Sequence, residues 1–288
     1  MTKPKAEDWL ISIDNKPKTK KPRKKDPCTR AVPSSCMVRI AEGAEIWETP
    51  RVKNSLYASA IGDKDWDITA ELIRFFKKPV PELRSLSLDL YAKQSSVKHA
   101  VWQERYHNRG ILHPCCTDDE GNFIEPRCFF PEHGISGKID WVLPDPKYLS
   151  AFGAKTSKKL PDIQEFFSSD IKESDSKQVG DMVPEIVSQK YMTQLSLYAE
   201  WVGNEGVGSG DKAFFFYLNR DKPMMAKYFE VKKDEKLIDL AKKRADEFWS
   251  KVRARDIPGV DKDWIEEEIS KQPDREWNPL SEIKNETS

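Results

Sequence analysis

The sequence predicts an α/β protein in which a mixed central β-sheet is flanked by helices, with an N-terminal helical cap. Short apolar and aromatic runs of alternating character predict strands, and runs with apolar residues three and four apart predict helices. The two kinds of run follow one another along the second half of the chain, as expected for layers of helix and sheet. With 288 residues, the chain is long enough to bury one core and to carry appendages.

The two ends of the chain differ in charge, although the formal net charge is zero. Residues 1–30 are predicted to form a basic disordered tail, because the run 16–25 is rich in lysine, contains no acid and is broken by prolines. Phosphate binding by charge, partner binding, a solubilising role and nuclear localisation all stay open for this run. Residues 259–288 are predicted to form an acidic tail.

Residues 31–94 are predicted to form the helical cap, because a helical stripe runs from residue 68 to residue 78 and ends at Pro79 and Pro81. The core is predicted to span residues 95–258 and to open with a helix at 95–109. The rest of the core is predicted to contain strands near 123–130, 137–143 and 165–172, a helix at 184–202, a strand pair at 212–219 and 225–232, and a helix at 234–255.

Local signals mark the ends of the later elements. Pro184 suits the first turn of a helix, and residues 220–223 are typical of a turn between two paired strands. Asp234 is predicted to cap the helix at 234–255, and Pro258 with Gly259 to end it. The buried stripe of that helix is predicted to contain Leu237, Leu240, Ala241, Phe248 and Val252.

Three residues on the predicted strands suit metal-dependent cutting of a phosphodiester. If the strands that carry Asp140 and Asp170 are neighbours, the two carboxylates approach one another and repel unless a cation or a proton joins them. Mg²⁺ prefers such oxygen ligands and keeps several waters. Lys172 lies two residues beyond Asp170, where it would orient or deprotonate a water, or screen charge on the phosphate.

The pattern acid-x-Lys is common by chance in a chain with 33% charged residues, and most occurrences are solvated surface. The occurrence at Asp145 contains Pro146, which argues against a central strand. The occurrence at Glu230 has no partner acid and no suitable helix after it. The set that includes Asp170 is therefore favoured.

The predicted helix at 184–202 carries Gln194 and Tyr198 four residues apart, and therefore on one side. On the functional interpretation, the amide and the phenol hold a DNA phosphate or sugar. On the structural one, Tyr198 is a core aromatic and Gln194 lies at its rim. Similarly, His99, Gln103 and Tyr106 are predicted to share one side of the helix at 95–109, so His99 can face the same cleft or be an ordinary surface or core histidine.

The order Gly134-x-x-Gly137-x-x-Asp140, Asp170-x-Lys172 and Gln194-x-x-x-Tyr198 resembles the PD-(D/E)XK nuclease superfamily, over roughly residues 90 to 258. It is most similar to the RecB-type branch, which includes CRISPR-associated and phage-encoded exonucleases. The resemblance implies a restriction-endonuclease-like core, with Asp140, Asp170 and Lys172 as catalytic residues. It also implies a Mg²⁺ or Mn²⁺ ion held by His99, Asp140, Asp170 and the Ile171 carbonyl, and DNA held by Gln194 and Tyr198. The chain departs from the family's usual pattern at Asp170, which stands in place of the usual Glu, in the long segment between Asp140 and Asp170, and in its cysteines.

The activity that the resemblance implies is a divalent-metal-dependent DNA exonuclease, acting in DNA end processing, recombination or phage replication. DNA and recombination or replication proteins are the implied partners, and a phage or bacterial origin is favoured. Two alternatives stay open: a structure-selective or nicking endonuclease on the same core, and a non-catalytic DNA-binding subunit.

Residues 144–164 are predicted to form an inserted basic loop. It is either solvated or lies against the DNA backbone through Lys155, Lys158 and Lys159. The Gly-rich piece 203–210 lacks the lysine and serine spacing of a nucleotide-binding loop, so no ATPase activity is predicted.

The chain has five cysteines, and none follows Tyr198. The cysteine arrangement of the family members that hold an iron–sulfur cluster is therefore absent, and no such cluster is predicted. A short region does gather thiols and imidazoles, namely His113, Cys115, Cys116, Cys128 and His133. Adjacent cysteines lack the gap of a zinc knuckle, so reduced cysteines are favoured over a structural zinc. This cysteine usage predicts a cytoplasmic protein, and no apolar run reaches membrane-spanning length.

Overall fold

The computed structural model describes residues 46–47, 54–76, 82–83, 86–145, 166–174, 188–219, 226–272 and 278–286. All of the described residues belong to the unit Ile46–Ser288. The predicted tail at 1–30 and the lysines of the predicted loop, Lys155, Lys158 and Lys159, lie outside the described residues. The predicted domain boundaries stay predictions.

The structure confirms the predicted α/β class. The largest sheet among the described residues is four-stranded and mixed, in the order β6-β7-β8-β9. Strand β7 pairs antiparallel with β6 and parallel with β8, and β8 pairs antiparallel with β9. The bounds of its strands are Trp141–Pro144 for β6, Phe166–Ser174 for β7, Lys212–Asn219 for β8 and Ala226–Lys232 for β9. The strand pair β8 and β9 is as predicted.

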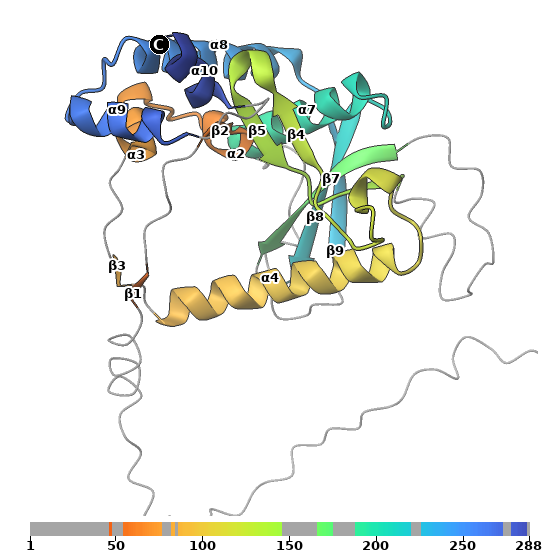
Figure 1. Cartoon of the computed structure of the whole chain (residues 1–288). Helices are drawn as coiled ribbons and strands as arrows, with labels where there is room; N and C mark the ends of the chain where they lie inside the picture. Colours follow the sequence, from red (N-terminus) through yellow and green to blue (C-terminus); the bar gives the residue numbers. More distant parts are fainter. Residues whose placement is uncertain are drawn as a thin grey trace, which may run out of the picture. The chain divides into compact units, whose positions relative to one another are not determined.

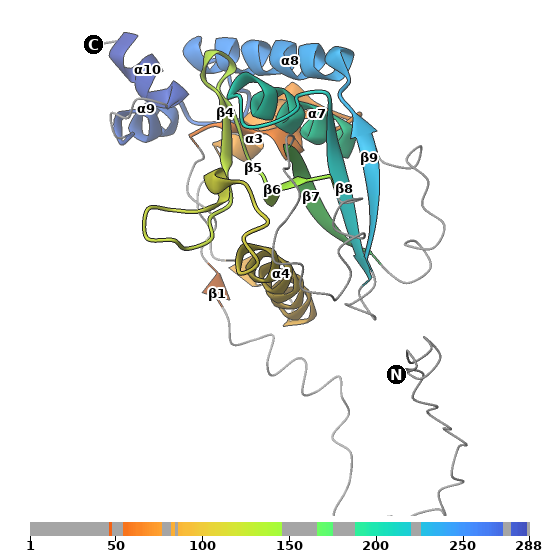
Figure 2. The same ribbon diagram turned by 90° about the vertical axis from the view of Figure 1, so that its right-hand side faces the viewer.

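A second sheet lies beside the first and has the order β2-β5-β4. Its strands are β2 (Leu56–Tyr57), β5 (Ile135–Lys138) and β4 (Arg127–Phe130), and a separate strand pair joins β1 (Ile46–Trp47) to β3 (Glu82–Leu83). Figure 2 shows β4 and β5 leading into β6 at the edge of the larger sheet.

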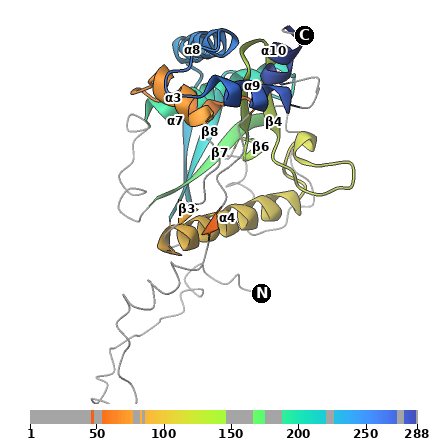
Figure 3. The same ribbon diagram turned by 60° about the vertical axis from the view of Figure 1, so that its left-hand side comes forward.

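Helices cover both faces of the four-stranded sheet. The bounds of the helices are α2 (Ala58–Ile61), α3 (Ile68–Phe75), α4 (Leu86–His107), η2 (Pro114–Cys116), η3 (Pro131–His133), α7 (Gln189–Asn204), α8 (Glu235–Arg253), α9 (Lys262–Ser270) and α10 (Pro279–Glu286). On one face, α7 packs on β7 and β8, with Tyr191 against Phe215. On the other, Tyr106 of α4 stacks edge-on against Trp141, which in turn contacts Phe216. In Figures 1 and 3, α4 runs across the strands near the end that lies away from α7 and α8.

Helix α8 shows how the sequence sets a helix end and a buried face. The Asp234 side chain accepts hydrogen bonds from the backbone of Lys236 and Leu237, as predicted for an N-cap. The predicted stripe is wrong in part, because Leu240 is 36% exposed. The stripe is turned toward the positions that pack on α2, α3 and α7, so Ile238, Ala245 and Trp249 are buried with Ala241, Phe248 and Val252.

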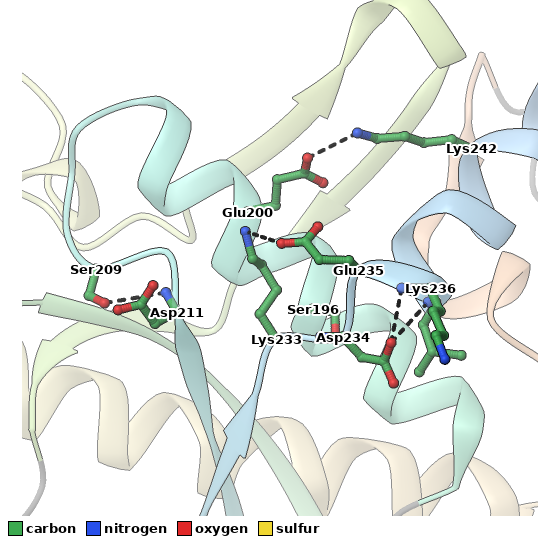
Figure 4. A network of polar contacts seen from close by, with 10 residues as sticks. Ser196, Glu200, Ser209, Asp211, Lys233, Asp234, Glu235, Lys236 and Lys242 are labelled. Carbon is green, nitrogen blue, oxygen red and sulfur yellow. Dashed lines mark hydrogen bonds and ion pairs between the residues drawn. The ribbon is translucent and has the colours of Figure 1, made fainter.

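Helices α7 and α8 are joined by polar contacts (Figure 4). Glu200 Oε1 accepts from Lys242 Nζ at 2.9 Å, and Ser196 Oγ accepts from the Asp234 backbone N–H at 3.1 Å. These contacts link α7, which packs on the sheet, to α8, which packs on α7.

Several predicted bounds are corrected by the structure. Helix α4 begins at Leu86 instead of residue 95, and α3 ends at Phe75 instead of residue 78. Strand β4 begins at Arg127 instead of residue 123. Helix α7 begins at Gln189, after the non-helical Ser188, instead of at Pro184. The predicted turn at 220–223 lies outside the described residues.

The last part of the chain also packs on the core. In the segment that the sequence assigns to an acidic tail, α9 and α10 bury Ile265, Ile269, Leu280 and Ile283 in the main hydrophobic cluster. Their apolar positions lie three or four apart, which gives each short helix one buried side despite its acidic composition. Among the described residues, no helix combines the length and the apolar character needed to cross a membrane.

The predicted strand at 137–143 is wrong as a single element. It is two strands, because β5 pairs with β2 and β4, whereas β6 pairs with β7 in the other sheet. The break falls at Ile139 and Asp140, and the Ile139 N–H donates to the Pro126 carbonyl at 2.9 Å. Asp140 therefore lies at a bend between two sheets and not within a continuous strand.

Candidate active site

Asp140 and Asp170 lie at the same end of the β6–β7 pair. The last register pair of β6 and β7 at this end is Trp141 with Ser169; Asp140 is the bend residue directly before β6, and Asp170 directly follows Ser169 within β7. Asp170 is 2% exposed, and the side chain of Asp140 is 15% exposed. The two acids that the sequence singled out thus lie close to the end of the β6–β7 ladder, and their convergence on one ion stays a prediction.

The phenol of Tyr198 lies in the field of both acids. Burial raises the pKa of Tyr198 well above its usual value of about 10, and the charges of Cys128, Asp170 and Asp140 raise it further. The hydrogen bond from Gln194 opposes this rise. Two consequences follow: the phenol stays protonated across the physiological pH range, and both carboxylates lie near it.

Gln194 and Tyr198 are buried and bonded to each other. Their exposed fractions are 4% and 2%, and Gln194 Nε2 donates to Tyr198 Oη at 2.8 Å. Both side chains are on the side of α7 that faces the acids, as the four-residue spacing predicts. Direct contact with DNA stays a prediction for both. Because both side chains are buried, a role in supporting the site from the protein interior is favoured.

Glycine is needed at each of the two positions before Asp140, 134 and 137, for a different physical reason. Gly134 ends η3 with φ of 60°, a conformation that favours glycine, and a Cβ there would lie 2.3 Å from Trp249 Nε1. A Cβ on Gly137 would lie 2.5 Å from Tyr198 Cε1 and 3.0 Å from Cys128 Sγ. Gly137 thus gives the Tyr198 ring the room it needs beside β5.

Helix α4 contacts the bend through three residues of one side. His99 Nδ1 lies 3.9 Å from Asp140 Oδ1, and Gln103 Nε2 donates to the Asp140 carbonyl at 3.1 Å. The Tyr106 ring stacks edge-on against Trp141 with 5.2 Å between centroids. The predicted helical side is therefore the one that faces the site. The sequence interpretation gave Gln103 no role, although its spacing of four from His99 was a usable signal.

The possible metal ligands near the bend are the two carboxylates, which are hard oxygen ligands, and the imidazole of His99. Among the described residues, no group of three or more His, Cys, Asp or Glu side chains is placed to hold one ion. His99, Asp140 and Asp170 therefore do not form a three-ligand cluster in this arrangement, and His99 as a metal ligand stays a prediction. Two carboxylates do suit Mg²⁺, which binds through one or two carboxylates together with waters and substrate phosphates.

The backbone of β7 continues past Asp170. Ile171 pairs in register with Phe216 of β8, and Lys172 pairs with Tyr217. A continuous strand at this position is the context that the acid-x-Lys interpretation requires. The roles of the Ile171 carbonyl and of Lys172 stay predictions.

The three described cysteines are free thiols, with Cys116 and Cys128 buried and Cys115 half-buried. Burial raises the pKa of Cys128, and the hydrogen bond with Cys115 followed by burial raises that of Cys116. The neighbouring imidazoles have other contacts: His113 Nδ1 accepts from the Cys115 backbone, and His133 Nδ1 lies 2.8 Å from Asp246 Oδ1. Each of these groups has a structural explanation in the described fold.

No protein-family model matches this chain, and no curated protein matches it. Among solved structures, the chain is similar to an alkaline exonuclease (LHK-Exo) from Laribacter hongkongensis, with a TM-score of 0.42, 12% identity, and coverage of 77% of this chain and 95% of that one. The structure of LHK-Exo in complex with dAMP gives a TM-score of 0.37 at 12% identity, over 76% of this chain and 94% of that one. The likeness at this level is distant, and the function proposed below rests on the site's own residues.

Proposed function

We propose that the chain is a divalent-metal-dependent deoxyribonuclease of the PD-(D/E)XK kind, acting as an exonuclease on DNA ends. The observation that supports this most directly is the placement of Asp140 and Asp170 at the same end of the β6–β7 pair, near a buried phenol whose pKa both acids raise. Two carboxylates at close range, one of them almost fully buried, favour a bound cation over a bare pair of charges.

The residues present fit Mg²⁺ or Mn²⁺. Asp140, Asp170 and the Ile171 carbonyl would supply oxygen ligands, with His99 beside Asp140 as a fourth candidate. When bound, such an ion polarises the phosphoryl oxygen and lowers the pKa of a bound water.

The remaining residues act on the water, the phosphate and the carboxylates. Lys172, on the same strand as Asp170, would orient the attacking water or accept its proton, and would offset charge that builds on the phosphate. The protonated phenol of Tyr198, which accepts a hydrogen bond from Gln194, would keep the packed side chains behind Asp140 and Asp170 in place. Direct contact between these two residues and a DNA strand would require the surrounding side chains to move apart, because both residues are buried.

DNA is the proposed substrate, and recombination or replication proteins are the proposed partners. Lys155, Lys158 and Lys159 are proposed to hold the DNA backbone by charge, which predicts binding that weakens as salt concentration rises. The proposed setting is DNA end processing, recombination or phage replication.

The test is degradation of linear and of closed circular DNA by the purified full-length protein, with Mg²⁺ and with a chelator. We expect linear DNA to be degraded from its ends and circles to stay intact. Asp170→Asn should reduce the rate at least about 1,000-fold, since it removes a charge that acts at the reacting centre. Asp145→Asn is a matched control, because Asp145 belongs to the acid-x-Lys occurrence that contains Pro146 and lies 3.9 Å from Lys212.

The outcomes separate the candidates. Nicked circles would replace the exonuclease with an endonuclease on the same core. Equal rates for Asp170→Asn and the wild type, or DNA binding without any metal-dependent cleavage, would refute the nuclease proposal.

A further inference from the structure

A buried glutamine on α4 holds the bend that carries Asp140. Gln103 is 6% exposed. Its Nε2 donates to the Asp140 carbonyl at 3.1 Å and to Glu125 Oε1 at 3.2 Å. An amide group has two N–H donors, so these two acceptors fix the orientation of the side chain.

Glu125 is itself held on its second oxygen. Lys138 Nζ lies 3.5 Å from Glu125 Oε2, and Lys138 is the last residue of β5. The next residue in each segment is also tied, because the Ile139 N–H donates to the Pro126 carbonyl at 2.9 Å. The segments 125–126 and 138–140 are therefore joined at two points, and Gln103 connects both of them to α4.

Helix α4 also approaches the side chain of Asp140. His99 lies one turn before Gln103 on α4, and its Nδ1 is 3.9 Å from Asp140 Oδ1. One side of α4 thus contacts both the carboxylate and the carbonyl of Asp140. A bend between two sheets has no strand ladder of its own, so its geometry depends on contacts of this kind.

We infer that Gln103 is a positioning residue, which fixes the backbone from which the Asp140 carboxylate reaches the proposed metal site. The inference rests on the proposed function, because the quantity it concerns is the affinity of Asp140 and Asp170 for a divalent ion. Residues that orient metal ligands in this way change metal affinity or activity by about 10–100-fold when they are lost. A residue that serves only packing changes the free energy of unfolding and leaves the metal affinity of the folded protein unchanged.

The experiment measures Mn²⁺ binding to the full-length protein by calorimetry in the absence of DNA. Gln103→Leu keeps the approximate size of the side chain and removes both donors. We expect its dissociation constant for Mn²⁺ to be about 10-fold higher than that of the wild type. Glu104→Gln, which changes the exposed neighbour on the same helix, should leave the constant unchanged. Thermal unfolding without metal shows whether each variant is folded.

A second pair of variants decides the matter if Gln103→Leu does not fold. Glu125 is only partly buried, with 33% of its side chain exposed, so its substitution is tolerated more easily. Glu125→Gln keeps an oxygen that can accept from Gln103, whereas Glu125→Leu removes it. We expect Mn²⁺ affinity to fall for Glu125→Leu, by less than for Gln103→Leu, and to stay near the wild-type value for Glu125→Gln.

The results for the inference and for the proposed function are distinguishable. If the wild type binds Mn²⁺ and degrades DNA, and whichever of Gln103→Leu and Glu125→Leu are folded bind Mn²⁺ as the wild type does, the positioning role is refuted and the nuclease stands. If the wild type binds no Mn²⁺ at millimolar concentration and cuts no DNA, both are refuted. Weaker Mn²⁺ binding by a folded Gln103→Leu, with an unchanged Glu104→Gln, supports the inference.

Discussion

Substituting Gly137 by Ala tests whether the side chains behind the two acids are packed as closely as the structure indicates. Gly137 pairs with Cys128 across β5 and β4, and its α-carbon faces the ring of Tyr198. The backbone angle φ of Gly137 is not in the left-handed region, so alanine is compatible with the backbone itself. Any effect of the added methyl group therefore comes from crowding against its neighbours.

The size of the effect follows from the distances. The new Cβ would lie 2.5 Å from Tyr198 Cε1 and 3.0 Å from Tyr198 Oη, and ordinary contact begins at 3.4 Å. The ring would have to retreat by about 0.9 Å toward Gln194, whose amide already donates to the phenol at 2.8 Å. Overpacking of this kind costs about 1–3 kcal/mol, and loss of the buried hydrogen bond adds about 1 kcal/mol. We therefore expect the free energy of unfolding to fall by about 2–4 kcal/mol.

Urea unfolding, followed by far-UV circular dichroism, measures this change, and a melting temperature lowered by roughly 2–4 °C for each kcal/mol should accompany it. The double variant Gly137→Ala with Tyr198→Leu relieves the contact, so its two effects should be clearly less than additive. A Gly137→Ala protein within about 0.5 kcal/mol of the wild type would refute the packing argument, as would full additivity in the double variant.

Two further predictions concern the support around the site. Lys242→Met removes the lysine that pairs with Glu200, whose side chain is only 15% exposed, so we expect the free energy of unfolding in urea to fall by about 1–3 kcal/mol. Adding Glu200→Gln should restore most of this loss. An absence of recovery would contradict the pairing in Figure 4. Burial, and then the neighbouring Tyr191 and Asp170, raise the pKa of Tyr217 to about 12. Between about pH 10 and pH 12, the unfolded chain loses this proton while the folded chain keeps it, so the free energy of unfolding falls as pH rises. Tyr217→Phe should flatten that decline in urea unfolding measured across this range, and an unchanged slope would contradict the assignment.

The elements that could be predicted from the sequence are those with a strong local signal. Strands β8 and β9 follow from aromatic and apolar runs, and the start of α8 follows from Asp234, whose side chain accepts two backbone N–H groups. Helix α7 follows from its apolar repeat, and its spacing correctly puts Gln194 and Tyr198 on one side. In each case the deciding interaction joins residues that are close in the sequence.

The parts that could not be predicted depend on contacts between distant residues. Residues 137–143 alternate as one strand would, and nothing local in the run shows that Lys138 pairs in one sheet and Trp141 in another. The stripe of α8 was misjudged at Leu240, because α2, α3 and α7 decide which side of the helix is covered. The burial of Gln194 likewise depends on strands that lie earlier in the chain.

The break between β5 and β6 also bears on how the site is held together. A residue inside a strand has its backbone fixed by two neighbouring strands, whereas Asp140 at the bend depends on α4 and on the segment before β4. Asp170, by contrast, lies in the middle of β7, where its backbone continues the strand and pairs in register with Phe215 of β8. Of the two acids, Asp140 should therefore be the more sensitive to changes away from the site, and substitutions on α4 that leave the sheet intact should act mainly through it. Native-state hydrogen exchange would detect this difference, because the amide of Ile139 at the bend should exchange faster than those of β7, and equal protection would contradict it.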